Sequence, residues 1–160
     1  MSKTGCVAEV PELGVVQLVL HSLKESGLVA AIGGSGLLAA LGLTQVVHDW
    51  DVTTDGPTSI VEVALDTAGV SYREAPAGIG VYASDGLYVV DGGSHEIDVI
   101  VGFAVRVGGR RIELPTRVSA TWQGIPLADP SVWERAYRLI GQPSKADLLS
   151  QWREQANSAQ

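Results

Sequence analysis

Two aspartates, Asp49 and Asp51, stand two positions apart in a stretch whose pattern predicts a β-strand. Residues i and i+2 of a strand point to the same face of the sheet, so we expect both carboxylates on one surface. Neighbouring carboxylates repel each other unless a cation or a group of hydrogen-bond donors neutralises them. Because Mg²⁺ binds a few carboxylate oxygens together with substrate phosphates, the pair predicts a magnesium site.

A glycine-rich turn precedes this pair. The apolar run over 28–32 predicts a buried strand that ends at Gly33 and Gly34, and Ser35 opens a short helix that reaches Leu43. Glycines allow the backbone to approach a ligand closely, and the free N–H groups at the start of a helix favour a phosphate. The turn therefore predicts a phosphate-binding site at Gly34 and Ser35, beside the carboxylates.

A third carboxylate, Asp98, lies inside the apolar strand predicted over 97–101. A buried charge without a partner is costly, so the acid needs a partner there. Coordination of the same metal is one interpretation. The other is an ion pair with Arg106, Arg110 or Arg111, and Asp98 taken alone favours the ion pair.

The elements that must position these residues follow from apolar periodicity and from glycine and proline turns. Helices are predicted over 11–26, 35–43, 57–68, 131–140 and 144–155, and strands over 28–32, 46–53, 79–82, 87–90, 97–101, 105–107 and 111–114. This order lacks a regular alternation of strand and helix, and it predicts an α+β fold in which a mixed sheet packs against helices. A length of 160 residues suits a single domain, over 1–156, followed by a polar tail over 157–160.

Composition narrows the function classes. The chain has 11 Lys and Arg against 18 Asp and Glu, a net charge of −7, so it lacks the basic surface typical of a nucleic-acid binder. The single cysteine, Cys6, excludes an internal disulfide. Apolar runs are too short to span a membrane, and the first residues lack a signal-peptide pattern, so we expect a cytoplasmic protein.

The succession of Gly34-Ser35, a short helix, Asp49-x-Asp51 and a later strand with Asp98 resembles the nucleotidyltransferase fold superfamily. That superfamily includes DNA polymerase beta-like transferases, antibiotic nucleotidyltransferases and toxin-type nucleotidyltransferases. The resemblance covers residues 28–102 and extends loosely to the last helices. It implies a Mg²⁺-dependent, in-line transfer of a nucleoside monophosphate from a nucleoside triphosphate such as ATP to an acceptor hydroxyl, with release of pyrophosphate.

The resemblance also implies roles for the residues that match its motif. Asp49 and Asp51 would bind two Mg²⁺ ions that bridge the triphosphate. Asp98 would bind the catalytic metal and help to deprotonate the acceptor hydroxyl. Gly34 and Ser35 would hold the β- and γ-phosphates.

The chain departs from the superfamily pattern in two respects. It is short, whereas relatives often add a helical domain, and a homodimer that completes the site from a second subunit is one hypothesis for this difference. Many relatives also place a lysine or arginine in a later helix to meet the phosphates. Lys145 is the candidate here for nucleotide binding, with a solvated cation at a helix end as the alternative.

Other interpretations remain open at the level of sequence. Residues 34–39 also fit the G-x-G-x-x-A pattern of dinucleotide-binding proteins, although the hairpin-rich remainder does not. A non-catalytic module that keeps this fold for binding or regulation is a further alternative. Trp133 and Tyr137, four apart on one helix, are predicted to pack. The acceptor can be a small molecule, a protein side chain or an RNA end.

Overall fold

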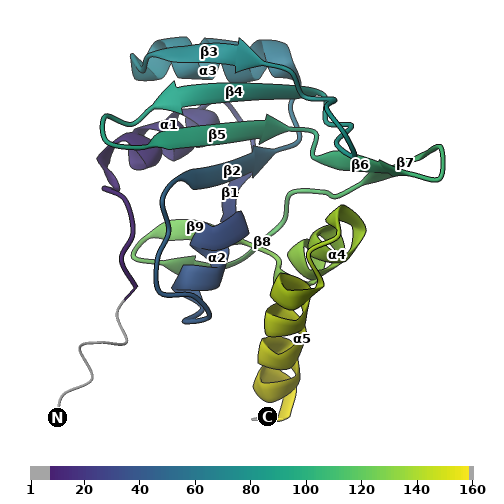
Figure 1. Ribbon diagram of the computed structural model, residues 1–160. Helices are drawn as coiled ribbons and strands as arrows, with labels where there is room; N and C mark the ends of the chain where they lie inside the picture. The colour runs from purple at the N-terminus through teal and green to yellow at the C-terminus, as the bar shows by residue number, and fades with distance from the viewer. Residues whose placement is uncertain (1–7, 159–160) are drawn as a thin grey trace, which may run out of the picture.

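The computed structural model describes residues 8–158, and a mixed seven-stranded sheet forms its centre (Figure 1). The strand order is β3-β4-β5-β2-β1-β9-β8, and β6 and β7 form a separate antiparallel hairpin. The strands are β1 (Ala30–Gly33), β2 (Trp50–Thr54), β3 (Tyr72–Ala75), β4 (Gly86–Asp91), β5 (Glu96–Val101), β6 (Ala104–Val107), β7 (Arg110–Glu113), β8 (Val118–Trp122) and β9 (Ile125–Ala128).

Two groups of helices flank this sheet. Helices α1 and α3 pack together behind the sheet in Figure 1, and α4 and α5 form a hairpin at the opposite side. The short helix α2 follows β1 directly, and its Gly36 lies against Ile32 and Trp50. The helices are α1 (Gly14–Glu25), α2 (Gly34–Ala40), α3 (Thr58–Ala68), α4 (Pro130–Ile140) and α5 (Pro143–Ser158).

One part of the core lies between the sheet and the α1–α3 pair, and buried residues of α4 and α5 such as Ala136 and Leu149 belong to the same cluster. Alternate residues of each central strand point into it, as in Ile97, Val99 and Val101 of β5, which are all 0% exposed. On the adjacent strand Tyr88 pairs with Val99 and donates its hydroxyl hydrogen to Glu62 of α3, which fixes the face on which these residues lie. The intervening residues of the same strands, Asp51 and Asp98 among them, therefore face the opposite side.

This architecture confirms the predicted α+β fold with a mixed sheet in a single-domain arrangement. Strand β1 is antiparallel to β2 and parallel to β9, while β2 is parallel to β5. A dinucleotide-binding turn belongs to a β-α-β unit with parallel strands, whereas here the strand after α2 returns antiparallel. The glycine turn is therefore not part of such a unit.

Three features of the sheet differ from the sequence-based expectations. The strand predicted over 79–82 is wrong, because this segment is a turn that touches β6 through one bridge at Tyr82. Strand β3 was not individually predicted. The β8–β9 hairpin was missed because β8 is polar and exposed, β9 contains Pro126, and the turn uses Gln123-Gly124, both with positive φ, in place of the usual Asn-Gly.

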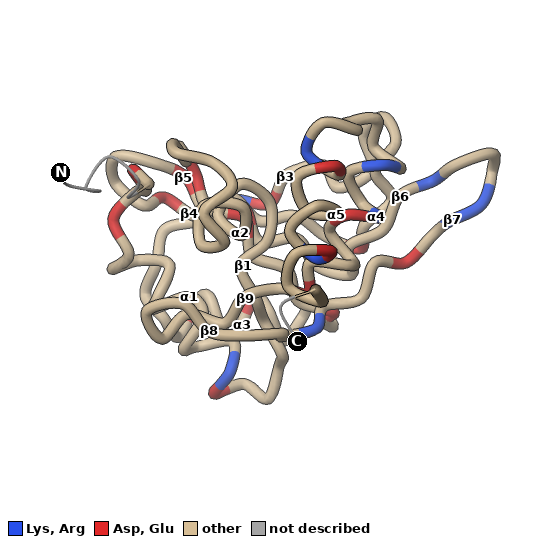
Figure 2. Tube along the Cα trace, turned by 90° about the horizontal axis from the view of Figure 1, so that it is seen from below, with Lys and Arg blue, Asp and Glu red and all other residues tan. Residues whose placement is uncertain are grey.

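Element bounds otherwise agree with prediction to within a few residues, apart from α5 and β2. Helix α5 continues through Asn157 to Ser158, into the segment predicted as a polar tail, and β2 begins at Trp50 instead of Val46. Cys6 lies outside the described residues. Over residues 8–158, no helix is both long enough and apolar enough to cross a membrane. Figure 2 shows basic residues along the projecting β6–β7 hairpin, which are Arg106, Arg110 and Arg111.

Candidate active site

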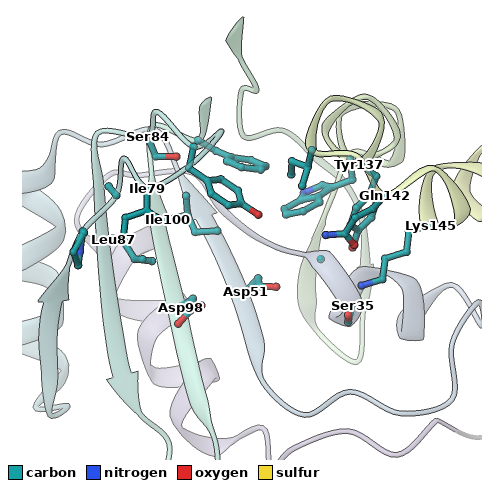
Figure 3. Close-up of a pocket in the computed structure, with 17 residues that line it drawn as sticks. Ser35, Asp51, Ile79, Ser84, Leu87, Asp98, Ile100, Tyr137, Gln142 and Lys145 are labelled. Atoms are coloured by element: carbon teal, nitrogen blue, oxygen red, sulfur yellow. The ribbon is translucent and has the colours of Figure 1, made fainter. Parts of the chain in front are cut away.

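A cleft of about 320 Å³ opens between the front face of the sheet and the α4–α5 hairpin (Figure 3). Strands β2, β5 and β4 form its floor, and the 76–84 segment forms the far wall. Its lining residues are Gly34, Ser35, Asp51, Pro76, Ala77, Ile79, Tyr82, Ser84, Leu87, Asp98, Ile100, Phe103, Trp133, Tyr137, Ile140, Gln142 and Lys145. Five of the six residues predicted for the site lie in this lining.

Two carboxylates stand side by side on the floor of the cleft. Asp51 of β2 and Asp98 of β5 are direct partners in the register of two parallel strands. Both are half-buried, and both belong to the strand face opposite the α1–α3 core. Because backbone pairing fixes the register, the two acids are held together by the sheet itself.

The surroundings favour the protonated form of both acids. Burial, followed by the charges of Asp98 and Asp49, raises the pKa of Asp51 to about 7, against a smaller opposing effect of Lys145. Burial also raises the pKa of Asp98, followed by the charges of Glu96 and Asp49. Two acids with raised pKa values in one cleft indicate a site that a bound cation would stabilise.

Asp49 is placed differently from the other two acids. Its Oδ1 accepts a hydrogen bond from the backbone N–H of Glu96 at 2.8 Å, and it lines a neighbouring polar depression instead of the cleft. Among residues 8–158, no three His, Cys, Asp or Glu side chains converge on a common metal position. Asp51 and Asp98 are thus the carboxylates that the structure brings together, and a metal-binding role for Asp49 stays a prediction.

The double glycine between β1 and α2 has a packing reason. A Cβ at Gly33 would overlap the indole of Trp133, and a Cβ at Gly34 would overlap the Asp51 carboxylate. Gly34 also has a φ of +58°, which side chains rarely adopt. The turn can therefore bring Ser35 and the Asp51 carboxylate to the same end of the cleft.

A lysine from the far end of the chain completes that end. Lys145, near the start of α5, lines the cleft, and Figure 3 shows its side chain extending toward Ser35. Its ammonium lies 5.5 Å from the centre of the Tyr137 ring. The lysine is half-buried and lines the cleft, and its role in nucleotide binding stays a prediction beside the alternative of a solvated helix-end cation.

The alternative of an arginine partner for Asp98 is not realised in the described residues. Arg111 of β7 forms ion pairs with Asp85, just before β4, at 3.1 Å and with Glu113 of β7 at 2.9 Å. The cation that acts on Asp98 is Arg73 of β3, which opposes the rise in its pKa. Asp98 is therefore left facing the cleft without an ion-pair partner among residues 8–158.

Sequence reasoning missed part of this lining. Trp133 and Tyr137 pack as predicted, with ring centres 5.5 Å apart, but they also form a wall of the cleft. Burial, and then the charge of Asp51, raises the pKa of the Tyr137 phenol. Gln142 joins them from the α4–α5 turn. The spacing of Trp133 and Tyr137 indicated one helix face, and nothing in the sequence indicated what that face would meet.

Comparison with known proteins gives matches in structure. No family model matches the chain, and no curated protein matches its sequence. Among solved structures, the nucleotidyltransferase candidate TM1012 from Thermotoga maritima is 22% identical with a TM-score of 0.65, and the match covers 89% of this chain and 92% of that one.

The second likeness is to the antibiotic-resistance factor ANT(2'')-Ia. Two structures of it match at 14% identity and a TM-score of 0.53. They cover 92% and 90% of this chain and 91% and 98% of theirs. One of them holds adenylyl-2''-tobramycin. At these identities the likeness shows a shared fold.

Proposed function

Because the chain has the nucleotidyltransferase fold, we propose that it transfers a nucleoside monophosphate from a nucleoside triphosphate to an acceptor hydroxyl in a Mg²⁺-dependent reaction. The observation that supports this most directly is the pairing of Asp51 with Asp98 in one cleft. Ser35 and Lys145 stand at one end of that cleft, as a triphosphate site requires.

The donor set fits Mg²⁺. That ion is commonly held by one or two carboxylates together with substrate phosphates, and Asp51 and Asp98 supply two neighbouring carboxylates. Burial, and after it the negative charge of nearby acids, raises the pKa of both carboxyls, and a bound dication would favour their ionised forms. When bound, Mg²⁺ would neutralise charge on the phosphates and on the oxygens that enter and leave.

Different residues of the cleft would bind the phosphates, accept the proton and exclude water. The Lys145 ammonium and the Ser35 hydroxyl would bind and orient the phosphates. The acceptor oxygen would bond to the α-phosphorus as the bond from that phosphorus to pyrophosphate breaks, and the acceptor's proton would pass to the Asp98 carboxylate. Tyr137 and Trp133 would shield this region from bulk water.

A thermal-shift titration with ATP, GTP, CTP and UTP, each with and without Mg²⁺, tests the proposal. A nucleotide at a hundred times its Kd raises the melting temperature of a protein of this size by roughly 5–10 °C. We expect such a shift with Mg²⁺ in the wild type, and its loss in Asp51→Asn. The matched control is Asp66→Asn on α3, which removes the same charge on the opposite side of the sheet.

A shift of equal size in Asp51→Asn would overturn the metal assignment. The absence of any shift with all four nucleotides would favour the alternative of a non-catalytic module.

A further inference from the structure

The cleft changes character beyond the two carboxylates. Two positions after Asp98, on the same face of β5, lies Ile100, and its partner across the strand pair is Leu87 of β4. Ile79 of the 76–84 segment lies beside them (Figure 3), and Pro76 and Ala77 of the same segment also line the cleft. We call these five residues, Pro76, Ala77, Ile79, Leu87 and Ile100, the apolar half of the cleft.

Two polar side chains near the apolar half, Ser84 and Asp85, are already engaged. The Ser84 hydroxyl accepts a hydrogen bond from the Ala104 N–H at 3.1 Å. Asp85 is paired with Arg111. Glu74 lies on the opposite face of the sheet, because it pairs with Tyr88 of the core face. Apart from Asp98, no carboxylate of residues 8–158 lines this half.

The adjoining polar depression is the other place where an acceptor could extend from Asp98. It contains the acids Asp49, Asp91 and Glu96. Each of them already has a partner: Asp49 accepts from the Glu96 N–H, Asp91 accepts from the Gly93 N–H at 2.8 Å, and Glu96 faces Arg73 at 3.7 Å. These contacts would compete with a cationic acceptor for the same carboxylates.

The mouth of the apolar half exposes hydrophobic surface. Ile79 is 65% exposed and Tyr82 is 42% exposed, although both line the cleft. Apolar area at the rim of a concave site is removed from water when an apolar ligand binds there. A highly hydrated or polycationic ligand gains nothing from the same surface.

We propose that the apolar half binds the acceptor, and that the acceptor is an uncharged alcohol or phenol with an aromatic or branched aliphatic body. The role of this ligand as acceptor rests on the proposed function, whereas its binding to the apolar half does not. Such an acceptor differs from a polycationic amino sugar such as tobramycin, which occurs as an adenylyl conjugate in one structural neighbour.

The test is a nuclear magnetic resonance titration of the methyl groups of the full chain, without nucleotide or metal. The probes are 2-phenylethanol, glucose and tobramycin, which carry hydroxyls on an aromatic, a neutral polar and a polycationic body. We expect 2-phenylethanol to shift the methyl resonances of Ile79, Leu87 and Ile100 saturably. We expect glucose and tobramycin to leave these resonances unchanged.

Two variants localise the binding. Leu87→Asn should weaken the 2-phenylethanol titration at least tenfold. Because Leu87 is half-buried, Ile79→Asn serves as the second variant at an exposed position, with an expected loss of threefold or more. The matched control is Val63→Asn on α3, which is 60% exposed and should bind like the wild type.

Three results would overturn the inference. The first is a saturable shift of these methyl groups by tobramycin or glucose. The second is the absence of saturation by 2-phenylethanol up to its solubility limit. The third is unchanged binding in both Leu87→Asn and Ile79→Asn.

These results are separable from the nucleotide titration. Binding of 2-phenylethanol without any nucleotide response would contradict the proposed function and leave the apolar half as a binding site. A nucleotide response without 2-phenylethanol binding would contradict this acceptor class alone.

Discussion

The two faces of the central sheet differ in what their residues do. On the face toward α1 and α3, strand β5 presents Ile97, Val99 and Val101, which have no exposed surface. On the face toward the cleft, the same strand presents Asp98 and Ile100. The difference teaches that alternate residues of one short strand can form the core on one face and line the candidate site on the other.

The largest effect is expected when the residue types of the two faces are exchanged at the neighbouring positions Val99 and Asp98. Val99→Asp would place a carboxylate in the apolar core, and we expect it to lower the free energy of unfolding by about 4 kcal/mol or more. Asp98→Val should leave that free energy unchanged or higher, because it removes an acid whose ionisation is opposed by burial and then by neighbouring charges, and should abolish transfer. Urea unfolding measures both variants, and equal destabilisation would contradict the division between faces.

The next effect is a pH dependence that belongs to the cleft face. Asp51 has a pKa of about 7 in the folded chain and about 3.8 when unfolded, so the folded state holds more protons between these values. The free energy of unfolding should therefore fall as pH rises from about 4 to 7 and level off above.

The ionisation of Asp51 should account for about 2–4 kcal/mol of this fall in the free energy of unfolding. The Asp51→Asn variant should lack this part of the pH dependence. At pH 8 its free energy of unfolding should therefore exceed that of the wild type by about 2–4 kcal/mol, as measured by urea unfolding at several pH values. Parallel pH profiles for wild type and Asp51→Asn would contradict the raised pKa.

A smaller effect is expected at the glycine turn between β1 and α2. Gly34→Ala combines a left-handed backbone with an overlap against the Asp51 carboxylate, so we expect a loss of about 2 kcal/mol and a weaker nucleotide response. The control is Gly69→Ala, which has a φ of +71° and open space around a Cβ, and should cost about 1 kcal/mol. Equal losses in thermal unfolding would show that the contact with Asp51 is unimportant.

The smallest effect on stability is expected at Lys145, which lies across the cleft from the paired acids. Lys145→Met keeps most of the apolar stem and removes the charge, so the stability of the free protein should change by less than about 0.5 kcal/mol. The affinity for a nucleoside triphosphate should fall about tenfold, or about 1.4 kcal/mol. Lys24→Met, on α1, is the matched control in the same titration. An unchanged affinity would remove Lys145 from the phosphate site.

Sequence reasoning reached the α+β fold because its main signals are local. The apolar run before Gly33 and the alternation through Asp98 are visible within a few residues. By contrast, β8 and β9 have no strong local signal and form a strand pair because β9 can pair with β1 at Ile32 and Leu127. Segment 79–82 has the composition of a strand, but its placement beside β6 leaves it a turn.

The candidate site divides in the same way. Gly34, Ser35, Asp51 and Asp98 could be selected from residue type and spacing, since register and strand parity bring them together. The apolar half could not be selected, because Ile79, Leu87 and Ile100 look like any core residue until the chain is folded. Asp49 shows the limit of parity: it precedes β2, and its carboxylate meets a backbone N–H of β5 instead of the cleft.

The cleft is built from segments that leave the ribosome at very different times. Gly34 and Ser35 emerge early, the Asp51–Asp98 pair can form once β5 has been made, and Lys145 arrives with the last described helix. A domain synthesised from its N-terminus can thus assemble its sheet well before the end of the cleft that holds Lys145 exists. Nucleotide binding at this cleft would accordingly report completion of the fold, and a nascent chain stalled before α5 would carry the paired acids but no lysine across the cleft from them.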